Sequence, residues 1–250
     1  MHLPQNTKQT SELTAPQTRL FLIGPPKSGK TFAAATFPNP FFLDFDSGLT
    51  SKELRERNLP HMPFYDTKFV KEVLKQQNKM NGLNWFLQNE AGKFTNEQTL
   101  VLDSISTIGD AVTEELDRVT PIGKTGEKDG FWFWKSWALW WQGLCTKLID
   151  LKCNVVVIAH EQEIRDSETG KVLSYMWMLK GKDFSPRMGQ FFTDVFRQTK
   201  KSSESGGKVT VEYLWQVHPT AQFQTACTRM KIDTLTVPAT YESIKKYIIV

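Results

Sequence analysis

The sequence predicts an α/β fold with a mainly parallel central sheet flanked by helices. Four apolar runs of strand length occupy residues 19–23, 41–45, 99–103 and 154–159. Near-continuous apolar strands are typical of sheets that are buried on both faces. Each run is followed by a segment long enough for the crossover helix that joins parallel strands. A central sheet covered by helices on both faces therefore accounts for this part of the chain.

The last third of the chain has a different pattern. Shorter strand-like runs occupy residues 191–199, 209–217 and 222–230, and turn-rich segments join them. These runs predict an antiparallel extension of the sheet. Residues 1–18 are polar and lack apolar periodicity, so we expect a flexible amino-terminal tail followed by a single domain over residues 19–250.

Length and composition agree with one folded domain. The chain has 250 residues, of which 40% are hydrophobic and 23% are charged, values that exclude a largely disordered or collagen-like chain. The 31 basic and 27 acidic residues give a net charge of +4, a mild excess that permits binding to a polyanion without requiring it. The three cysteines have no CxxC spacing, which argues against a disulfide framework or a zinc site.

Nothing in the sequence indicates a membrane span or a secretion signal. The most apolar stretch, residues 131–151, carries Lys135, Lys147 and Asp150, whereas a span needs roughly 20 predominantly apolar residues. The amino-terminal residues lack the basic and apolar regions of a signal peptide. We therefore expect a cytoplasmic protein without a membrane partner.

Residues 24–31, GPPKSGKT, match the phosphate-binding loop pattern G-x-x-x-x-G-K-[ST] in its required context, after an apolar strand and before a run of helix formers. Backbone amides and a helix amino terminus suit a phosphate chain, and because prolines lack an N–H, the amides must come from residues 27–31. A simple glycine turn with a solvated lysine is the alternative. The residues that we expect to contact ATP are Gly24, Pro25, Pro26, Lys27, Ser28, Gly29, Lys30, Thr31 and Phe32.

Two residues of this loop and one later acid predict a magnesium site. Lys30 is expected to bind the β and γ phosphates, and the Thr31 hydroxyl is expected to bind Mg²⁺. Asp103 ends an apolar strand, where an acid can hold a magnesium-bound water beside Thr31. An Asp at a strand end can instead act only as a helix cap, which is the alternative for Asp103.

Two further strand ends carry candidate catalytic groups. Asp44 and Asp46 lie two residues apart at the end of the second apolar run, hence on one face, and one of them can orient an attacking water. His160 follows the fourth run, at the sheet edge where ligands of open α/β folds bind, and can contact the γ phosphate. The alternatives are an Asx turn at Asp46 before Gly48 and a purely structural histidine.

The motifs GPPKSGKT, FFLDFDSGL, LVLDSIS and VVVIAHE resemble those of small phage-encoded RecA-like P-loop ATPases, a group that includes single-strand annealing recombinases. The resemblance covers residues 19–235. It implies Mg²⁺-dependent ATP hydrolysis by a RecA-like protein that forms a ring or filament in the cytoplasm of the host cell. It gives Asp46 the role of activating water. The family usually has Glu there, and the shorter Asp predicts slow or partner-dependent hydrolysis.

The resemblance also implies single-stranded DNA as the partner, contacted by one loop at residues 120–130 and a second at residues 162–187. Basic groups bind phosphates and aromatic rings stack on bases, the combination that proteins use for single strands without sequence specificity. A single-strand DNA-binding protein is a further candidate partner. The residues expected to contact DNA are Lys124, Lys128, Phe131, Trp132, Arg165, Lys171, Lys180, Lys182 and Arg187.

The tryptophan-rich segment after the first loop also fits a buried helix face. Its spacing favours a place in the core for Trp134, Trp137, Trp141 and Leu144.

Two cations near the end of the chain are candidates for a role at the next subunit. Arg229 and Lys231 lie two residues apart in an expected terminal strand, so they point the same way. The resemblance implies that they reach the γ phosphate on a neighbouring subunit. A solvated strand edge is the alternative.

The sequence leaves three functions open. The first is an ATP-dependent recombination or annealing protein that oligomerises on single-stranded DNA. The second is a small-molecule P-loop kinase, which the absence of an arginine-rich lid disfavours. The third is a non-catalytic, ATP-switched binding module in replication or packaging, which Asp46 in the place of the usual Glu favours.

Overall fold

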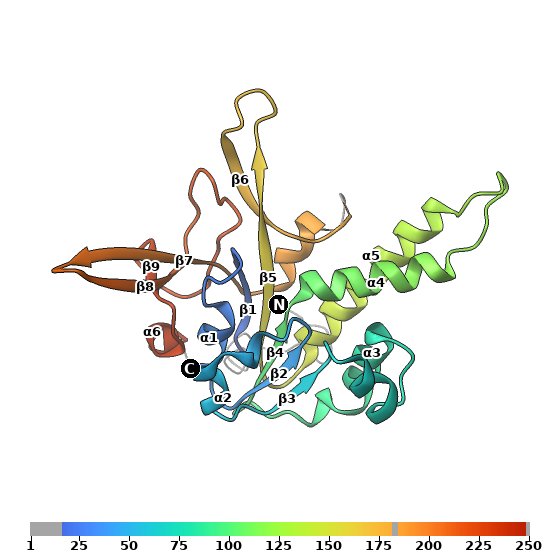
Figure 1. Ribbon diagram of the computed structural model, residues 1–250, viewed down its shortest axis with the longest axis horizontal. Coiled ribbons are helices and arrows are strands. Elements are labelled where there is room, and N and C mark those ends of the chain that lie inside the picture. Colours follow the sequence, from blue (N-terminus) through green and yellow to red (C-terminus); the bar gives the residue numbers. More distant parts are fainter. Residues whose placement is uncertain (1–16, 182–184, 249–250) are drawn as a thin grey trace, which may run out of the picture.

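The computed structural model describes residues 17–181 and 185–248, in which nine strands form one mixed sheet. The strand order is β3-β2-β4-β5-β1-β7-β8-β9, and β6 pairs with β5 outside this path (Figure 1). The first six strands in that order are mutually parallel, whereas β5–β6, β7–β8 and β8–β9 are antiparallel pairs. The strands are β1 (Arg19–Gly24), β2 (Pro40–Asp44), β3 (His61–Pro63), β4 (Thr99–Asp103), β5 (Asn154–Arg165), β6 (Val172–Trp177), β7 (Asp194–Ser205), β8 (Lys208–Gln216) and β9 (Thr236–Pro238).

Helices cover both faces of this sheet. The helices α3, α4 and α5 pack on one face, and α1, α2 and α6 contribute buried residues to the other. The α-helices are α1 (Lys30–Ala34), α2 (Lys52–Glu56), α3 (Lys79–Asn89), α4 (Ile105–Val119), α5 (Gly130–Asp150) and α6 (Tyr241–Lys245). Shorter helical segments are η2 (Gly48–Thr50), the π-helical η3 (Phe69–Val73), η4 (Ala91–Lys93) and η5 (Ser185–Phe191).

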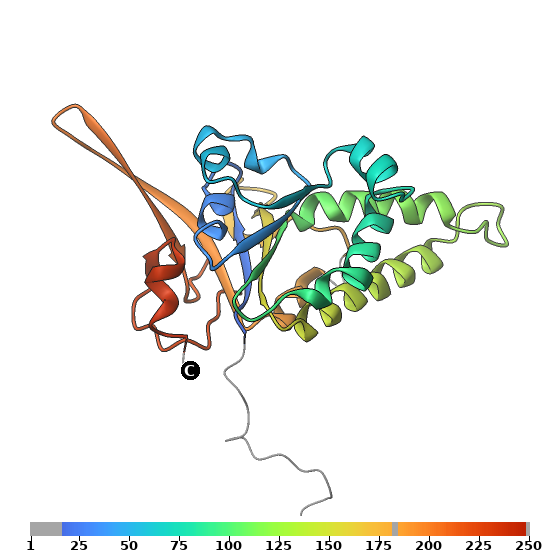
Figure 2. The same ribbon diagram turned by 90° about the horizontal axis from the view of Figure 1, so that it is seen from below.

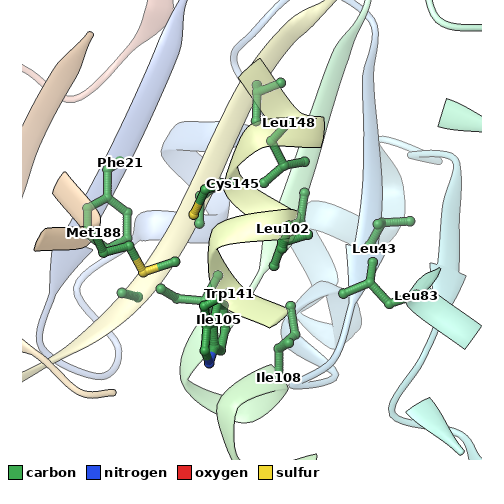
Figure 3. Close-up of a cluster of buried hydrophobic side chains, with 14 of the residues drawn as sticks. Phe21, Leu43, Leu83, Leu102, Ile105, Ile108, Trp141, Cys145, Leu148 and Met188 are labelled. Carbon is green, nitrogen blue, oxygen red and sulfur yellow. The ribbon is translucent and has the colours of Figure 1, made fainter. Parts of the chain in front are cut away.

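The alternation of side chains along the strands divides the core into two clusters. In β1, Phe21 and Ile23 belong to the cluster under α3, α4 and α5, whereas Leu20 and Leu22 belong to the cluster on the opposite face. Figure 3 shows part of the first cluster, where Trp141 of α5 lies close to Ile105 of α4. Burial on both faces explains the continuous apolar strands, and the predicted fold class is confirmed.

The prediction that the tryptophan segment is core is confirmed for three of its four residues. Trp137, Trp141 and Leu144 of α5 are buried. Trp134 is 48% exposed, because the first turns of α5 extend past the edge of the core (Figure 2). The helical spacing was correct, but the sequence does not reveal where the opposing surface ends.

The carboxyl-terminal strands differ from the prediction in two places. β7 runs parallel to β1, so the antiparallel extension begins only with β8. Residues 222–230 form no strand and make a single bridge between Cys227 and Val195. Asp194 explains this, because its Oδ1 accepts hydrogen bonds from Thr228 Oγ1 and from the Arg229 backbone N–H, which turns the chain away from a ladder. Arg229 and Lys231 therefore do not lie in a strand.

Most of the expected loop at residues 162–187 is a hairpin. β5 continues to Arg165 and pairs antiparallel with β6, so that Glu161 is opposite Trp177. Only residues 166–171 connect the two strands. Leu173 and Trp177 lie on the same side of β6, but Trp177 is buried at the base of the hairpin whereas Leu173 near its end is exposed, so the hairpin extends beyond the core.

Three hairpins project from the body of the domain. They are the helical hairpin α4–α5, the strand hairpin β5–β6 and the ribbon β7–β8 (Figures 1 and 2). Among the described residues, no helix is long and apolar enough to cross a membrane. The expected tail falls mainly on residues 1–16, which lie outside the described residues, so the division into tail and domain stays a prediction.

Arg19 connects the first strand of the sheet to the end of α5. Its buried guanidinium donates hydrogen bonds to the backbone carbonyls of Ile149 (3.1 Å), Leu151 and Cys153 (2.5 Å). Burial lowers the pKa of Arg19, and the nearby Cys153 and Asp150 oppose that effect. The Ile149 carbonyl is in the last turn of α5, where carbonyls lack a helical partner, and those of Leu151 and Cys153 follow the helix, so Arg19 acts as a cap from a distant strand.

Replacing Arg19 with Ala is expected to lower the free energy of unfolding by about 3 kcal/mol, because it leaves several buried carbonyls without donors. For a domain of this size, the melting temperature falls by about 6–12 °C. Thermal unfolding followed by circular dichroism checks this. As a control, Arg118→Ala removes an exposed pair with Glu115 and is expected to leave the melting temperature nearly unchanged. Equal effects of the two substitutions would show that Arg19 is not a cap.

Candidate nucleotide-binding site

Parallel pairing brings the ends of four strands to one edge of the sheet. Gly24 at the end of β1 is in register with His160 of β5, and Asp103 at the end of β4 is in register with Asp44 of β2. The loop after β1 carries the phosphate-binding signature and leads into α1. Gly29 in this loop has φ +88°, a conformation that side chains rarely adopt, and a Cβ there would lie 3.0 Å from the ring of Tyr213.

A cavity of about 1070 Å³ opens at this edge. Seven of the nine residues expected to contact ATP line it, whereas Gly24 and Pro25 do not. The predicted Asp46, Asp103 and His160 line it as well. The seven residues are Pro26, Lys27, Ser28, Gly29, Lys30, Thr31 and Phe32. Residues from four separate segments of the chain thus line one cavity, and they include candidates for binding phosphate, binding a metal and catalysing hydrolysis.

Lys30 is buried at the base of this cavity. Its Nζ donates hydrogen bonds to the carbonyls of Gly24 and Pro25, both at 2.8 Å. Burial lowers the pKa of Lys30 to about 8, although Asp103, Glu161 and Asp46 act in the opposite direction. A buried cation with only carbonyl partners is suited to bind the negative charge of a phosphate chain.

Thr31 and Asp103 meet beside Lys30. Thr31 Oγ1 donates a hydrogen bond of 2.6 Å to Asp103 Oδ2. Burial raises the pKa of Asp103 to about 7, a shift that the Thr31 hydrogen bond opposes. A hydroxyl and a buried carboxylate in contact are hard oxygen ligands of the kind that Mg²⁺ takes, directly or through water. Their geometry fits the predicted metal role, and the helix-cap alternative for Asp103 is not needed.

Gly48 was not predicted, although it lies directly against this pair. A Cβ at Gly48 would lie 3.1 Å from Asp103 Oδ2 and 3.2 Å from Thr31 Oγ1. The space next to both oxygens therefore exists because residue 48 has no side chain. The sequence signal is the run Asp46-Ser47-Gly48, in which Gly48 enters the sequence-based interpretation only through the alternative of an Asx turn at Asp46.

The two acids after β2 have different surroundings. Asp44 is buried, and its Oδ1 accepts hydrogen bonds from the backbone N–H groups of Asp46 and Gly48. Burial raises its pKa, while these backbone hydrogen bonds act against the shift. The expectation that the two carboxylates share one face is therefore wrong, because Asp44 holds the turn that directs Asp46 into the cavity.

Asp46 lies between two polar side chains. Its Oδ2 is 3.0 Å from His160 Nε2, and its Oδ1 accepts a hydrogen bond from Thr107 of α4. Burial alone raises the pKa of Asp46, but the hydrogen bonds from His160 and Thr107 reverse this, so the net direction is downward. Asp46 is therefore an ionised acceptor in contact with the predicted γ-phosphate sensor. Thr107 was missed because nothing in the sequence distinguishes it from Thr113, the other threonine of α4.

The remaining predicted site residues lie outside this cavity. The backbone N–H of Arg229 donates to Asp194 at the start of β7, so Arg229 lies at the sheet edge opposite to the cavity. Lys231, two residues later, is exposed. The expected DNA contacts are spread over the projecting α4–α5 and β5–β6 hairpins and the segment that follows β6. Lys182 lies outside the described residues.

A family model described as an AAA domain matches residues 17–219, which is most of the chain and includes every wall of the cavity described above except Ala239. The chain belongs to the AAA domain family. No curated protein matches this AAA domain chain.

The solved structures that are similar to this chain include the following three, all at low identity. The RadB recombinase is 15% identical, with 82% of this chain and 83% of that chain covered and a TM-score of 0.41. FlaH from Methanocaldococcus jannaschii is 12% identical, with 89% and 84% covered and a TM-score of 0.36. The KaiC-like protein PH0186 from Pyrococcus horikoshii OT3 is 13% identical, with 88% and 84% covered and a TM-score of 0.40. Similarity at this level carries no information about activity.

Replacing Gly48 with Ala is expected to weaken Mg²⁺-dependent nucleotide binding at least tenfold, because the added Cβ would occupy the space beside Thr31 and Asp103. Calorimetric titration of ATP with and without Mg²⁺ measures this, and the loss should appear mainly in the presence of the metal. The matched control is Gly143→Ala, where a Cβ meets nothing within 4 Å. If Gly48→Ala binds ATP with the same Mg²⁺-dependent affinity as wild type, Mg²⁺ does not bind beside Thr31 and Asp103.

Proposed function

We propose that this AAA domain protein is a phage-encoded, Mg²⁺-dependent ATPase that acts on single-stranded DNA as an oligomer, in annealing or recombination in the host cytoplasm. The observation that carries the proposal is the contact between Thr31 and Asp103 beside the buried Lys30, inside a cavity of about 1070 Å³. ATP needs a cation for its outer phosphates, oxygen ligands for its metal and a group that orients water. Each of these has a candidate residue in the same cavity.

Each residue in the cavity has a separate role in the proposed binding and hydrolysis of ATP. Lys30 holds the outer phosphates, and Thr31 and Asp103 hold Mg²⁺, which supplies positive charge that neutralises the phosphates. Asp46 accepts a hydrogen bond from the attacking water and orients it. His160 contacts Asp46 and lies in β5 in register with Gly24 at the end of β1, where it senses whether the γ phosphate is present. The carbonyls of Gly24 and Pro25 hold the Lys30 ammonium until phosphate replaces them.

Replacing Asp46 with Asn is expected to preserve ATP affinity within about threefold and to slow hydrolysis by about 10²-fold or more, the size of a general-base contribution. The amide keeps the shape of the side chain but loses the negative charge that orients water. Phosphate release and calorimetric binding measure the two quantities. Asp110→Asn on the exposed surface of α4 is the control. If Asp46→Asn hydrolyses ATP at the wild-type rate, another residue orients the attacking water.

The residues that we propose to contact DNA differ in whether their side chains already form ion pairs within the protein. Lys128, Arg165 and Lys180 already pair with Asp117, Glu163 and Asp110. Over residues 17–181 and 185–248, the side chains of Lys124, Lys171 and Arg187 form no hydrogen bond or ion pair, so they are available for phosphates. Phe131 is 80% exposed and suits base stacking, whereas Trp132 packs partly on the core.

The triple substitution of Lys124, Lys171 and Arg187 by Ala is expected to flatten the dependence of log K on log salt for single-stranded DNA. Removing one contact with a phosphate reduces the slope by up to about 0.7. Fluorescence anisotropy with labelled oligonucleotides over a salt series measures the slope. Replacing Lys68, Lys71 and Lys147 by Ala removes the same charge from other exposed positions and serves as the control. If both triple variants behave alike, only net charge matters and these hairpins are not the DNA site.

Arg229 and Lys231 complete the proposal as cations that act on the nucleotide of a neighbouring subunit. A group that serves a neighbour must lie away from its own cavity, and the position of Arg229 beside Asp194 is consistent with that requirement. An oligomer is therefore part of the proposed function.

A non-catalytic ATP switch is the second candidate function. Both oxygens of Asp46 already have a partner, Thr107 and His160, which leaves this carboxylate less able to position water. Phosphate release measured with and without single-stranded DNA separates the candidates. Stimulation by DNA supports the ATPase, ATP binding without turnover supports the switch, and ADP formation that depends on a small-molecule acceptor supports a kinase.

A further inference from the structure

An ion pair that the proposed function does not use lies at the start of the phosphate-binding loop. Arg197 of β7 donates two hydrogen bonds to the carboxylate of Glu161 in β5, from Nε at 2.8 Å and from Nη2 at 2.9 Å. The side chains of Arg197 and Glu161 are only 16% and 6% exposed. The guanidinium Cζ also lies 3.7 Å from the ring centre of Tyr175 in β6. A bidentate contact of this kind holds both side chains in one orientation.

The strand order places this pair across the end of β1. Strand β1 lies between β5 and β7 in the sheet (Figure 1). Its last residue, Gly24, is in register with His160, which directly precedes Glu161. On the other side, Ile23 is in register with Arg197. The two side chains therefore meet where β1 ends and the phosphate-binding loop begins.

The strands do not need this pair to stay together. Strand β1 pairs with β5 over residues 19–24 and with β7 over residues 20–23, so backbone ladders already join all three strands. Charged groups also lose hydration when they are buried, and apolar side chains of similar volume often stabilise a fold equally well. A role in stability alone therefore does not explain why two charged side chains occupy this position.

The surroundings of Lys30 indicate another role. Burial lowers the pKa of Lys30, and the charges of three nearby carboxylates act against that effect. They belong to Asp103, Glu161 and Asp46. The hydrogen bonds of Lys30 Nζ go to two carbonyls of the loop, whereas the carboxylates accept from other donors. These donors are Thr31 for Asp103, Thr107 for Asp46 and Arg197 for Glu161. The Lys30 ammonium is thus left for a ligand.

Glu161 differs from the other two acids, because the proposed chemistry gives it no task. Neighbouring strands lie about 4.8 Å apart, so the side chain of Glu161 begins within reach of the Gly24 carbonyl that Lys30 binds. A hydrogen bond between two charged groups is stronger than one to a neutral carbonyl. A Glu161 carboxylate without Arg197 would therefore take Lys30 as its partner and compete with the phosphates.

We propose that Arg197 is a positioning residue that holds Glu161 away from Lys30, so that the Lys30 ammonium stays available for the phosphates of the nucleotide. The inference rests on the proposed ATP site and adds to it two residues that do not line the cavity. Tyr175 supports the arrangement, because its ring holds the guanidinium from the side of β6. The pair has no net charge, so it adds no repulsion to the phosphates.

Two single variants and their combination test this role. Arg197→Met is expected to weaken Mg²⁺-dependent binding of a non-hydrolysable ATP analogue by about tenfold or more, because the unpaired carboxylate occupies Lys30. Glu161→Gln removes the competing charge and should bind within about threefold of wild type, and so should the double variant, because additive losses are not expected for coupled residues. Calorimetric titration measures the affinities.

Three further variants separate positioning from a general effect on the fold. Arg197→Lys keeps the charge that neutralises Glu161 and should restore most of the affinity lost in Arg197→Met. Tyr175→Leu loosens the guanidinium and should give a smaller loss, which adding Glu161→Gln reverses. Arg118→Met removes an arginine from an exposed pair and should bind like wild type. Circular dichroism melting curves establish folding, and the Tyr175 variants test the inference even if Arg197→Met does not fold.

Recovery of binding on removal of the second charge is the result specific to this inference. A pair needed only for the fold, or an arginine that itself binds phosphate, would leave the double variant as weak as Arg197→Met, and that outcome overturns the inference. Wild-type affinity in Arg197→Met, or weak binding by Glu161→Gln alone, overturns it as well. In these cases wild type still binds the analogue. A wild type that binds no nucleotide instead overturns the proposed function, and the role of Arg197 with it.

Discussion

The in-register parallel pairing of β2, β4, β5 and β1 is the constraint on which the candidate site depends. It brings Gly24 next to His160 and Asp103 next to Asp44, although Gly24 and His160 are separated by more than half of the chain. Burial of the strands on both faces fixes this register, because a shift by one residue would move every apolar side chain to the wrong face. The position of the Thr31–Asp103 contact therefore follows from core packing as much as from the loop itself.

The cavity concentrates buried charge of both signs around a space open to a ligand. Burial lowers the pKa of Lys30 to about 8 and raises that of Asp103 to about 7, so each group is less stable in its charged form than it would be in water. A ligand that brings both phosphate and a divalent cation offers each of them an opposite charge. Under the proposed function, this complementarity accounts for the presence of these costly groups together and for the space beside them at Gly48.

The sequence predicted the fold class and the phosphate loop well because both depend on local patterns. Continuous apolar runs report burial on two faces, and the signature at residues 24–31 specifies its own geometry. The errors arose where long-range packing decides. Asp194 diverts residues 222–230 from a strand, and Trp134 lies beyond the edge of the core. Tyr213 could not be foreseen, because only the strand order brings β8 against Gly29.

Calorimetric titration of Mg²⁺·ATP into wild type and Lys30→Ala tests the central claim most directly, because the loop, the metal pair and the proposed function all require phosphates at Lys30. The account predicts saturable Mg²⁺-dependent binding by wild type and at least a hundredfold weaker binding by Lys30→Ala, with a melting curve that still shows a folded protein. Lys68→Ala, at an exposed position outside the cavity, should bind like wild type. Equal affinities of wild type and Lys30→Ala, or no binding by wild type, would contradict it.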